Sequence, residues 1–221
     1  MLPEITYGSI VAIRRWSAAL LAVWALLLAG PALSEPLRVV ALGDSLTAGY
    51  GVTGENAFPA KLQQALAKRG VEAAIVNAGV SGDTVADGLA RLDWSIPDGT
   101  QAVLVELGAN DMLRGLNPVR TKASLEEILS RLKARGIPAM ILGMRAAPNL
   151  GPDYQAAFDG IFPELATKYG APLYPFFLDG VAGNGALNQP DGLHPNVKGV
   201  EVIVERAAPA IAAFLKTLKP N

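Results

Sequence analysis

The sequence predicts an α/β fold, in which a parallel β-sheet lies between two layers of helices. Short apolar runs alternate with longer amphipathic stretches along most of the chain, as strands and helices do when they follow one another in turn. Most of the short runs contain almost no polar residue, which is typical of strands covered on both faces. Right-handed crossovers then place a helix after each strand and keep the strands parallel. We therefore expect a single three-layer α/β/α domain.

Five apolar runs are the predicted strands. They are residues 37–42 (LRVVAL), 73–78 (AAIVNA), 102–107 (AVLVEL), 138–144 (PAMILGM) and the brief 172–174 (PLY). In an open sheet of this kind, functional groups gather in the loops that follow the carboxyl ends of the strands.

Apolar residues recur at helical spacing between these strands. The stretch 58–66 stops at Gly70, a residue typical of a helix C-cap. The stretch 125–132 is preceded by Ser124, which with Glu127 has the spacing of a capping box. Further helical patterns cover residues 153–169 and 197–217.

Composition narrows the class of protein. The chain has 221 residues, of which 51% are hydrophobic and 18% charged, enough for one sizeable core. A formal net charge of -1 and the lack of a Lys/Arg cluster argue against a nucleic-acid partner. Because there is no cysteine, disulfides, thiolate catalysis, cysteine-based zinc sites and a lipid-modified cysteine anchor are excluded.

Residues 1–34 have the features of a signal peptide. Arg14 and Arg15 precede the apolar stretch 16–30, and Ala32 and Ser34 have the spacing that a signal peptidase reads. We expect cleavage after Ser34, a mature domain over residues 35–221, and a periplasmic or secreted protein without a stable membrane anchor. The alternative is an uncleaved anchor, but the apolar stretch is shorter than the roughly 20 residues that span a bilayer core.

Four loops combine glycine with small polar residues. Each could be an ordinary turn, because turns use the same residue types. Three of them follow predicted strands, so the fold would bring them together. They are GDSLTAGYG (43–51), NAGVSGDT (77–84), LGANDMLRG (107–115) and DGLHPN (191–196).

A serine, a histidine and an aspartate in these loops predict a catalytic triad. His194 is the only histidine, and Asp191 lies three residues before it, where a carboxylate can accept a hydrogen bond from Nδ1–H and leave Nε2 free. Ser45 needs such a base, because a free serine hydroxyl is a weak nucleophile. The alternatives are an incidental histidine and a serine that serves as a helix N-cap. The nucleophile-elbow pattern GxSxG does not occur.

Three groups are candidates for an oxyanion hole. They are the backbone N–H of Ser45, the backbone N–H of Gly82, and the side-chain amide of Asn110. Gly79 is a rival to Gly82, which could instead start a helix, and Asn110 could instead form an Asx-turn.

These four loops together resemble the four conserved blocks of the SGNH (GDSL) hydrolase family. The similarity covers nearly all of residues 35–221 and is closest to the secreted bacterial branch of arylesterases, acyl-CoA thioesterase I and lysophospholipases. The resemblance implies a flavodoxin-like fold with a five-stranded parallel sheet. It also implies that Ser45 is the nucleophile, that Asp191 and His194 complete the triad, and that Gly82, not Gly79, and Asn110 bind the oxyanion. Gly108 then fits the motif GxND, and Asp44 has a supporting role in the motif GDS.

The expected activity is hydrolysis of a carboxylic ester or thioester through an acyl-enzyme on Ser45, without cofactor or metal. In related enzymes the loop after the fourth strand forms a wall of the acyl groove. We therefore expect Leu46, Met112, Pro148 and Leu150 to line a groove for an apolar acyl group. Aryl esters, acyl-CoA and lysophospholipids are the candidate substrates.

Two alternatives come from other classes of protein. Asp44, Asp83 and Asp111 all follow predicted strands, and three carboxylates could hold Mg²⁺ in a metal-dependent phosphatase. A non-catalytic binding protein of the cell envelope would keep the apolar groove but would not need a histidine beside an acid.

Overall fold

The computed structural model describes residues 35–218. The predicted signal peptide and its cleavage site lie outside these residues. The five strands are β1 (Leu37–Gly43), β2 (Ala73–Gly79), β3 (Ala102–Glu106), β4 (Ala139–Leu142) and β5 (Leu173–Tyr174). They form one parallel sheet in the order β2-β1-β3-β4-β5. This is the flavodoxin-like order, and it confirms the predicted five-stranded parallel sheet.

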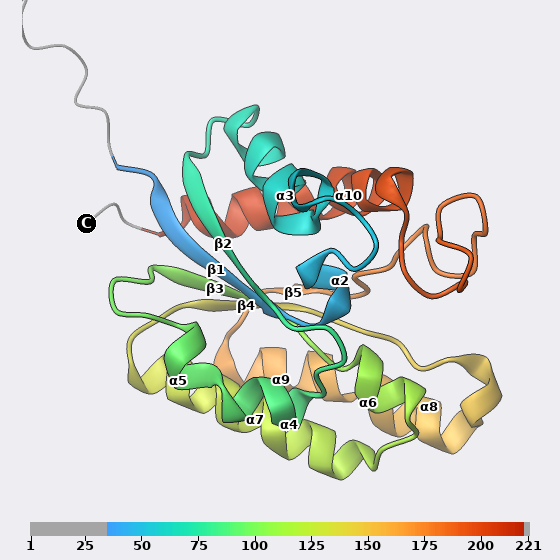
Figure 1. Cartoon of the computed structure of the whole chain (residues 1–221). Coiled ribbons are helices and arrows are strands. Elements are labelled where there is room, and N and C mark those ends of the chain that lie inside the picture. The colour runs from blue at the N-terminus through green and yellow to red at the C-terminus, as the bar shows by residue number, and fades with distance from the viewer. Residues whose placement is uncertain (1–34, 219–221) are drawn as a thin grey trace, which may run out of the picture. The chain divides into compact units, whose positions relative to one another are not determined.

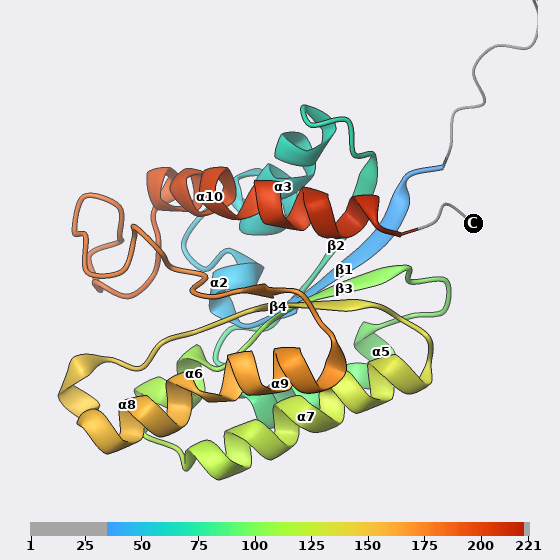
Figure 2. The same cartoon turned by 180° about the vertical axis from the view of Figure 1, so that it is seen from behind.

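Helices cover both faces of the sheet (Figure 1). They are α2 (Ser45–Ala48), η1 (Gly54–Asn56), α3 (Phe58–Ala67), α4 (Val85–Ala90), α5 (Leu92–Ser95), α6 (Ala109–Leu113), α7 (Pro118–Ala134), η2 (Pro148–Leu150), α8 (Pro152–Asp159), α9 (Ile161–Tyr169) and α10 (Val197–Lys216). The pair α3 and α10 packs on one face, and α7 with α4 and α9 packs on the other (Figure 1). The opposite view in Figure 2 shows α7 and α9 across the sheet from α3 and α10. No helix of residues 35–218 has the length and apolar character needed to cross a membrane.

The core follows the order of the strands. All five residues of β3 are buried at the centre of the sheet. The run 73–78 differs from the fully covered strand that its composition indicates: β2 is an edge strand, and the side chain of Val76 is 52% exposed. An apolar run therefore predicts a strand here, but not its place in the sheet.

Two helix predictions need correction. The capping box at Ser124 is wrong, because α7 begins at Pro118, where the side chain of Asn117 accepts a hydrogen bond from the Val119 N–H. Proline at the first position of a helix gives up no hydrogen bond, so it marks this start. The pattern at 153–169 is two helices, α8 and α9, separated at Gly160.

Candidate active site

The turn after β1 presents Ser45. Asp44 is the N-cap of α2, and its Oδ1 accepts a hydrogen bond of 2.9 Å from the Leu46 N–H. Ser45 is therefore the first residue of the helix, and its alternative role as the N-cap is wrong. Gly43 permits this tight turn, since a Cβ there would lie 2.1 Å from Oγ1 of Thr47.

The structure brings Ser45 together with His194 and Asp191, which are far from it in the sequence. Nε2 of His194 lies 2.9 Å from Oγ of Ser45, although 149 positions separate the two residues. Nδ1 of His194 lies 2.6 Å from Oδ2 of Asp191. This geometry places the proton on Nδ1 and leaves Nε2 able to accept the serine proton.

Asp191 is held as an anion. Its Oδ1 accepts the N–H groups of His194 at 3.0 Å and of Leu193 at 2.9 Å. The hydrogen bonds from the backbone and ring of His194, followed by the one from Leu193, lower the pKa of Asp191 to about 2. The carboxylate is therefore ionised throughout the neutral range and can stabilise an imidazolium.

Asn110 extends from α6 toward the turn that holds Ser45. Its Nδ2 donates to the carbonyl oxygen of Asp83 at 3.0 Å and to Oδ2 of Asp44 at 3.2 Å. Gly108, the N-cap of α6, has a φ of +120°, and a Cβ there would lie 3.3 Å from the ring of Phe162. Both amide hydrogens of Asn110 thus have protein acceptors, and the longer bond goes to Asp44.

Gly82 and Gly79 differ in what their N–H groups can do. The Gly79 N–H donates to Oδ1 of Asn77, and a Cβ at Gly79 would lie 2.2 Å from the backbone nitrogen of Ala48. Gly82 has a φ of +90°, and within residues 35–218 neither its N–H nor that of Ser45 has a protein acceptor. Gly82 is therefore the better donor of the two glycines.

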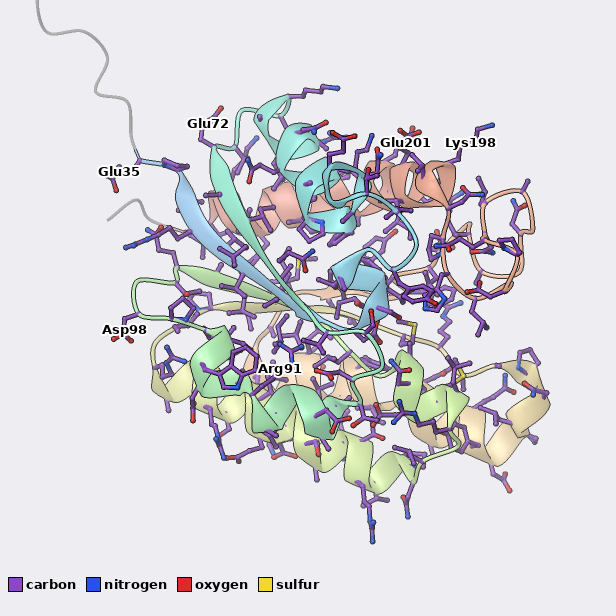
Figure 3. The ribbon with its side chains drawn as sticks, viewed as in Figure 1. Glu35, Glu72, Arg91, Asp98, Lys198 and Glu201 are labelled. Atoms are coloured by element: carbon purple, nitrogen blue, oxygen red, sulfur yellow. The ribbon has the colours of Figure 1, made fainter. Side chains whose placement is uncertain are left out.

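Arg91, at the junction of α4 and α5 (Figure 3), ties two of the loops together. Its Nε lies 2.5 Å from Oδ2 of Asp83, and its Nη2 donates to the carbonyl oxygen of Gly43 at 2.8 Å. Its Nη1 donates to Oγ of Ser95 at 3.0 Å. Sequence reasoning missed this buried arginine. Its one signal in the sequence is its position between apolar helical residues, eight residues after Asp83.

Two buried carboxyl groups lie behind the turn. Burial raises the pKa of Asp44 to about 6, against the lowering effect of its bonds from Leu46 and Asn110. Burial, and then the charge of Asp44, raise the pKa of Glu106 well above its usual range. Oε2 of Glu106 accepts a 2.8 Å bond from Oγ1 of Thr47, while Oε1 has no partner in the described part of the chain. Glu106 was also missed, although a lone acid in the run AVLVEL was its signal.

The aspartates considered for a phosphatase do not converge on a common point. Asp44 and Asp83 are bonded as described above, and Asp111 accepts from the Thr121 hydroxyl and from the Val85 N–H, each at 2.9 Å. Residues 35–218 hold no group of three or more acidic or histidine side chains that could bind a metal ion. The geometry therefore gives the phosphatase alternative no support.

A cavity of about 630 Å³ opens beside Ser45 and His194. Leu46, Met112 and Pro148, which were expected to line an acyl groove, do line this cavity. Leu150 does not line it and instead packs against the core from η2. Two of the described residues that line this cavity can carry a charge, namely His194 and Arg145. Other lining residues are mostly apolar and include Leu113, Met144, Ala146, Phe176 and Leu178.

Comparison with known proteins gives consistent matches. The model of the GDSL-like lipase/acylhydrolase family matches residues 41–202. Esterase TesA of Pseudomonas aeruginosa is 37% identical over 190 residues, which cover 86% of this chain and 94% of that protein. Thioesterase 1/protease 1/lysophospholipase L1 of Escherichia coli strain K12 is 42% identical over 156 residues, or 70% of this chain and 74% of that protein.

Solved structures agree with these matches. The crystal structure of AlinE4, an SGNH-hydrolase family esterase, is 48% identical with a TM-score of 0.70. The match covers 83% of this chain and 99% of that one. The similarity therefore extends over most of the residues that build the sheet and its loops.

Proposed function

The chain belongs to the GDSL-like lipase/acylhydrolase (SGNH) family and is a carboxylic ester hydrolase, and we propose that Ser45 is its nucleophile. The observation that carries this proposal is the 2.9 Å contact between Oγ of Ser45 and Nε2 of His194. His194 is the general base, and Asp191 holds the ring in the tautomer that can accept a proton.

The reaction has two steps. Oγ of Ser45 attacks the carbonyl carbon as its proton passes to Nε2 of His194, and the carbonyl oxygen becomes an oxyanion. The N–H groups of Ser45 and Gly82 and the amide of Asn110 donate to this oxyanion. Collapse of the intermediate expels the alcohol or thiol, which takes the proton from Nε2. A water molecule, deprotonated by the same nitrogen, then releases the acid and restores the serine.

The substrates are esters or thioesters with an apolar acyl group. The support for this is the cavity beside Ser45, whose walls are formed mainly by aliphatic, methionine and aromatic side chains. Burial of such surface favours a hydrocarbon chain by roughly 25 cal/mol per Å² removed from water. Aryl esters, acyl-CoA and lysophospholipids all carry such a group.

The enzyme acts in the periplasm or outside the cell, as a domain that begins after Ser34. The support for this is the pattern of two arginines, an apolar stretch and small residues that precede the domain. Mass spectrometry of the intact protein from a periplasmic extract of a bacterial host tests it. A mature chain that starts at Glu35 is expected, and a retained 1–34 segment would contradict export by cleavage.

The catalytic assignment is tested with Ser45→Ala and the matched control Ser130→Ala, which changes an exposed serine of α7. Turnover of p-nitrophenyl esters of two to sixteen carbons is measured for both, with circular dichroism as the check on folding. A fluorophosphonate probe is expected to label the control but not the Ser45 variant. A near-native rate in the folded Ser45 variant would overturn the assignment.

A further inference from the structure

His194 and Asp191 lie on a segment without regular structure. Residues 187–196 contain no helix, and their one β-feature is an isolated bridge between Asn188 and Pro195. Ser45, by contrast, is fixed by the end of β1 and by α2. A proton can pass from Ser45 to His194 only if the two segments stay within hydrogen-bond distance. Some contact other than the reacting pair must therefore hold the segments together.

Gln189 makes this contact. Its Nε2 donates to the carbonyl oxygen of Tyr50 at 2.7 Å and to that of Pro195 at 3.0 Å. Its backbone N–H donates to the carbonyl oxygen of His194 at 2.7 Å. One residue thus binds the segment that follows Ser45 and also the carbonyl oxygens of two successive residues, His194 and Pro195.

Tyr50 completes the connection to the nucleophile. Its N–H donates to the carbonyl oxygen of Ser45 at 3.0 Å, and its ring lies 4.6 Å from the ring of His194 between centroids. Gly51, the next residue, has a φ of +74°, and a Cβ there would lie 2.1 Å from Oε1 of Gln189. Glycine at this position therefore leaves room for the amide of Gln189.

The other side-chain amides of this region act differently. Asn188 donates to the carbonyl oxygens of Val181 and Asn184, and Asn196 donates to those of Ala186 and Asn188. These bonds stay within residues 181–196, so they shape the segment but do not attach it. In the described structure, side-chain hydrogen bonds join residues 44–51 to residues 187–196 at two places. One is the contact between Ser45 and His194, and the other is the bond from Gln189 to Tyr50.

We propose that Gln189 is a positioning residue for the hydrolytic reaction, which sets the distance between Ser45 and His194 by bonding to Tyr50 and Pro195. The inference rests on the proposed function, since it needs Ser45 and His194 to be the reacting pair. Catalytic groups displaced by about 1 Å lose on the order of 100-fold in rate. Loss of the bridge should therefore lower kcat by about 10- to 100-fold and change KM by less than about threefold.

The test compares Gln189→Glu, Gln189→Leu and wild type between pH 5 and pH 8. In Gln189→Glu an ionised carboxylate would face two carbonyl oxygens, whereas the protonated form can still donate to one of them. The kcat of this variant relative to wild type should therefore rise at least threefold as the pH falls, while the ratio for Gln189→Leu stays low and flat. Asp44, Tyr50, Asp191 and His194 are the titratable side chains of the two joined segments, and all four are present in every protein compared.

Gln64→Glu and Gln64→Leu, at an exposed site on α3, are the matched controls and should keep wild-type kcat. Inactivation by a fluorophosphonate, which needs the Ser45 and His194 pair but little of the acyl cavity, should slow in parallel with kcat. Gln189→Asn, whose amide is one methylene shorter, replaces the leucine variant if circular dichroism shows that variant unfolded, and a low, pH-independent ratio is again expected.

Wild-type kcat in the folded Gln189 variants, or a Gln189→Glu ratio that does not change with pH, would overturn the inference. So would unfolding of all three Gln189 variants while the Gln64 variants remain folded. If Ser45→Ala is inactive, any of these three results removes only the role of Gln189 and leaves the proposed function intact. An active Ser45→Ala removes both.

Discussion

Asp44 gives the sharpest physical prediction, because the fold holds an acid in a place where its charge is costly. The side chain is fully buried, and burial raises its pKa from 3.8 to about 6. Between these two pH values the folded protein binds a proton that the unfolded chain releases. The contribution of protonated Asp44 to the free energy of unfolding is therefore fully present below pH ~4. It decreases as the pH rises toward 6, and above that value it is lost.

The size of the effect follows from the shift. A change of about 2 pKa units at ~1.4 kcal/mol per unit corresponds to about 3 kcal/mol. Asp44→Asn removes the ionisation but can still accept the Leu46 N–H through its amide oxygen. Its amide nitrogen would face the amide of Asn110, which costs stability at every pH. This constant cost cancels when the variant and wild type are compared at several pH values.

The measurement is urea unfolding of wild type and Asp44→Asn at pH 4, 5, 6 and 7. The free energy of unfolding of the variant relative to wild type should rise by about 2 kcal/mol from pH 4 to pH 7 and then level off. Glu106→Gln is measured in the same way for comparison. Its free energy of unfolding relative to wild type should keep rising above pH 6, because the pKa of Glu106 is raised well above its usual range. A difference between Asp44→Asn and wild type that stays constant or shrinks as the pH rises would refute the reasoning.

Three further predictions concern the triad, the cavity and the turn before Asn110. Asp191→Asn should lower kcat for p-nitrophenyl butyrate by about 10³-fold or more, because an amide favours the wrong tautomer of the imidazole, and a loss below tenfold would contradict this. Arg145→Gln removes a positive charge from the cavity wall. It should raise KM about three- to tenfold for anionic acyl-CoA at low salt and leave KM for neutral p-nitrophenyl esters unchanged. Equal effects on the KM values of both substrates would count against this prediction. Gly108→Ala should cost about 1–3 kcal/mol in urea unfolding, because alanine resists the +120° φ and crowds Phe162, whereas Gly54→Ala, which meets nothing within 4 Å, is the control.

The fold could be predicted from the sequence because its strands are separated by helices and most are covered on both faces. The runs at 102–107 and 37–42 became the buried β3 and β1, and the parallel order confirms the prediction. The same reasoning could not place β2 at the edge, since AAIVNA has the composition of a central strand. Helix boundaries were less predictable, as Ser124 lies well inside α7.

The candidate site could be predicted where its residues have their own local pattern. Asp191 and His194 are three residues apart, and Ser45 follows the end of a strand, so both signals are local. Arg91 and Glu106 act through partners far away in the sequence, namely Gly43 and Thr47. No spacing reveals such pairs, and only the folded chain shows what each buried charge or acid is bonded to.

The hydrogen bonds of Asn110 add a further step to the proposed mechanism. Its amide is held by the Asp83 carbonyl and, at 3.2 Å, by the carboxylate of Asp44. The neutral carbonyl oxygen of a bound ester is a weaker acceptor than this carboxylate, so it competes poorly for the amide. An oxyanion is an acceptor of the same charged kind, so it can compete with Asp44 for this hydrogen where the neutral carbonyl cannot. The bond from Asn110 is then made mainly in the transition state, which is the condition for an interaction to raise kcat as well as affinity.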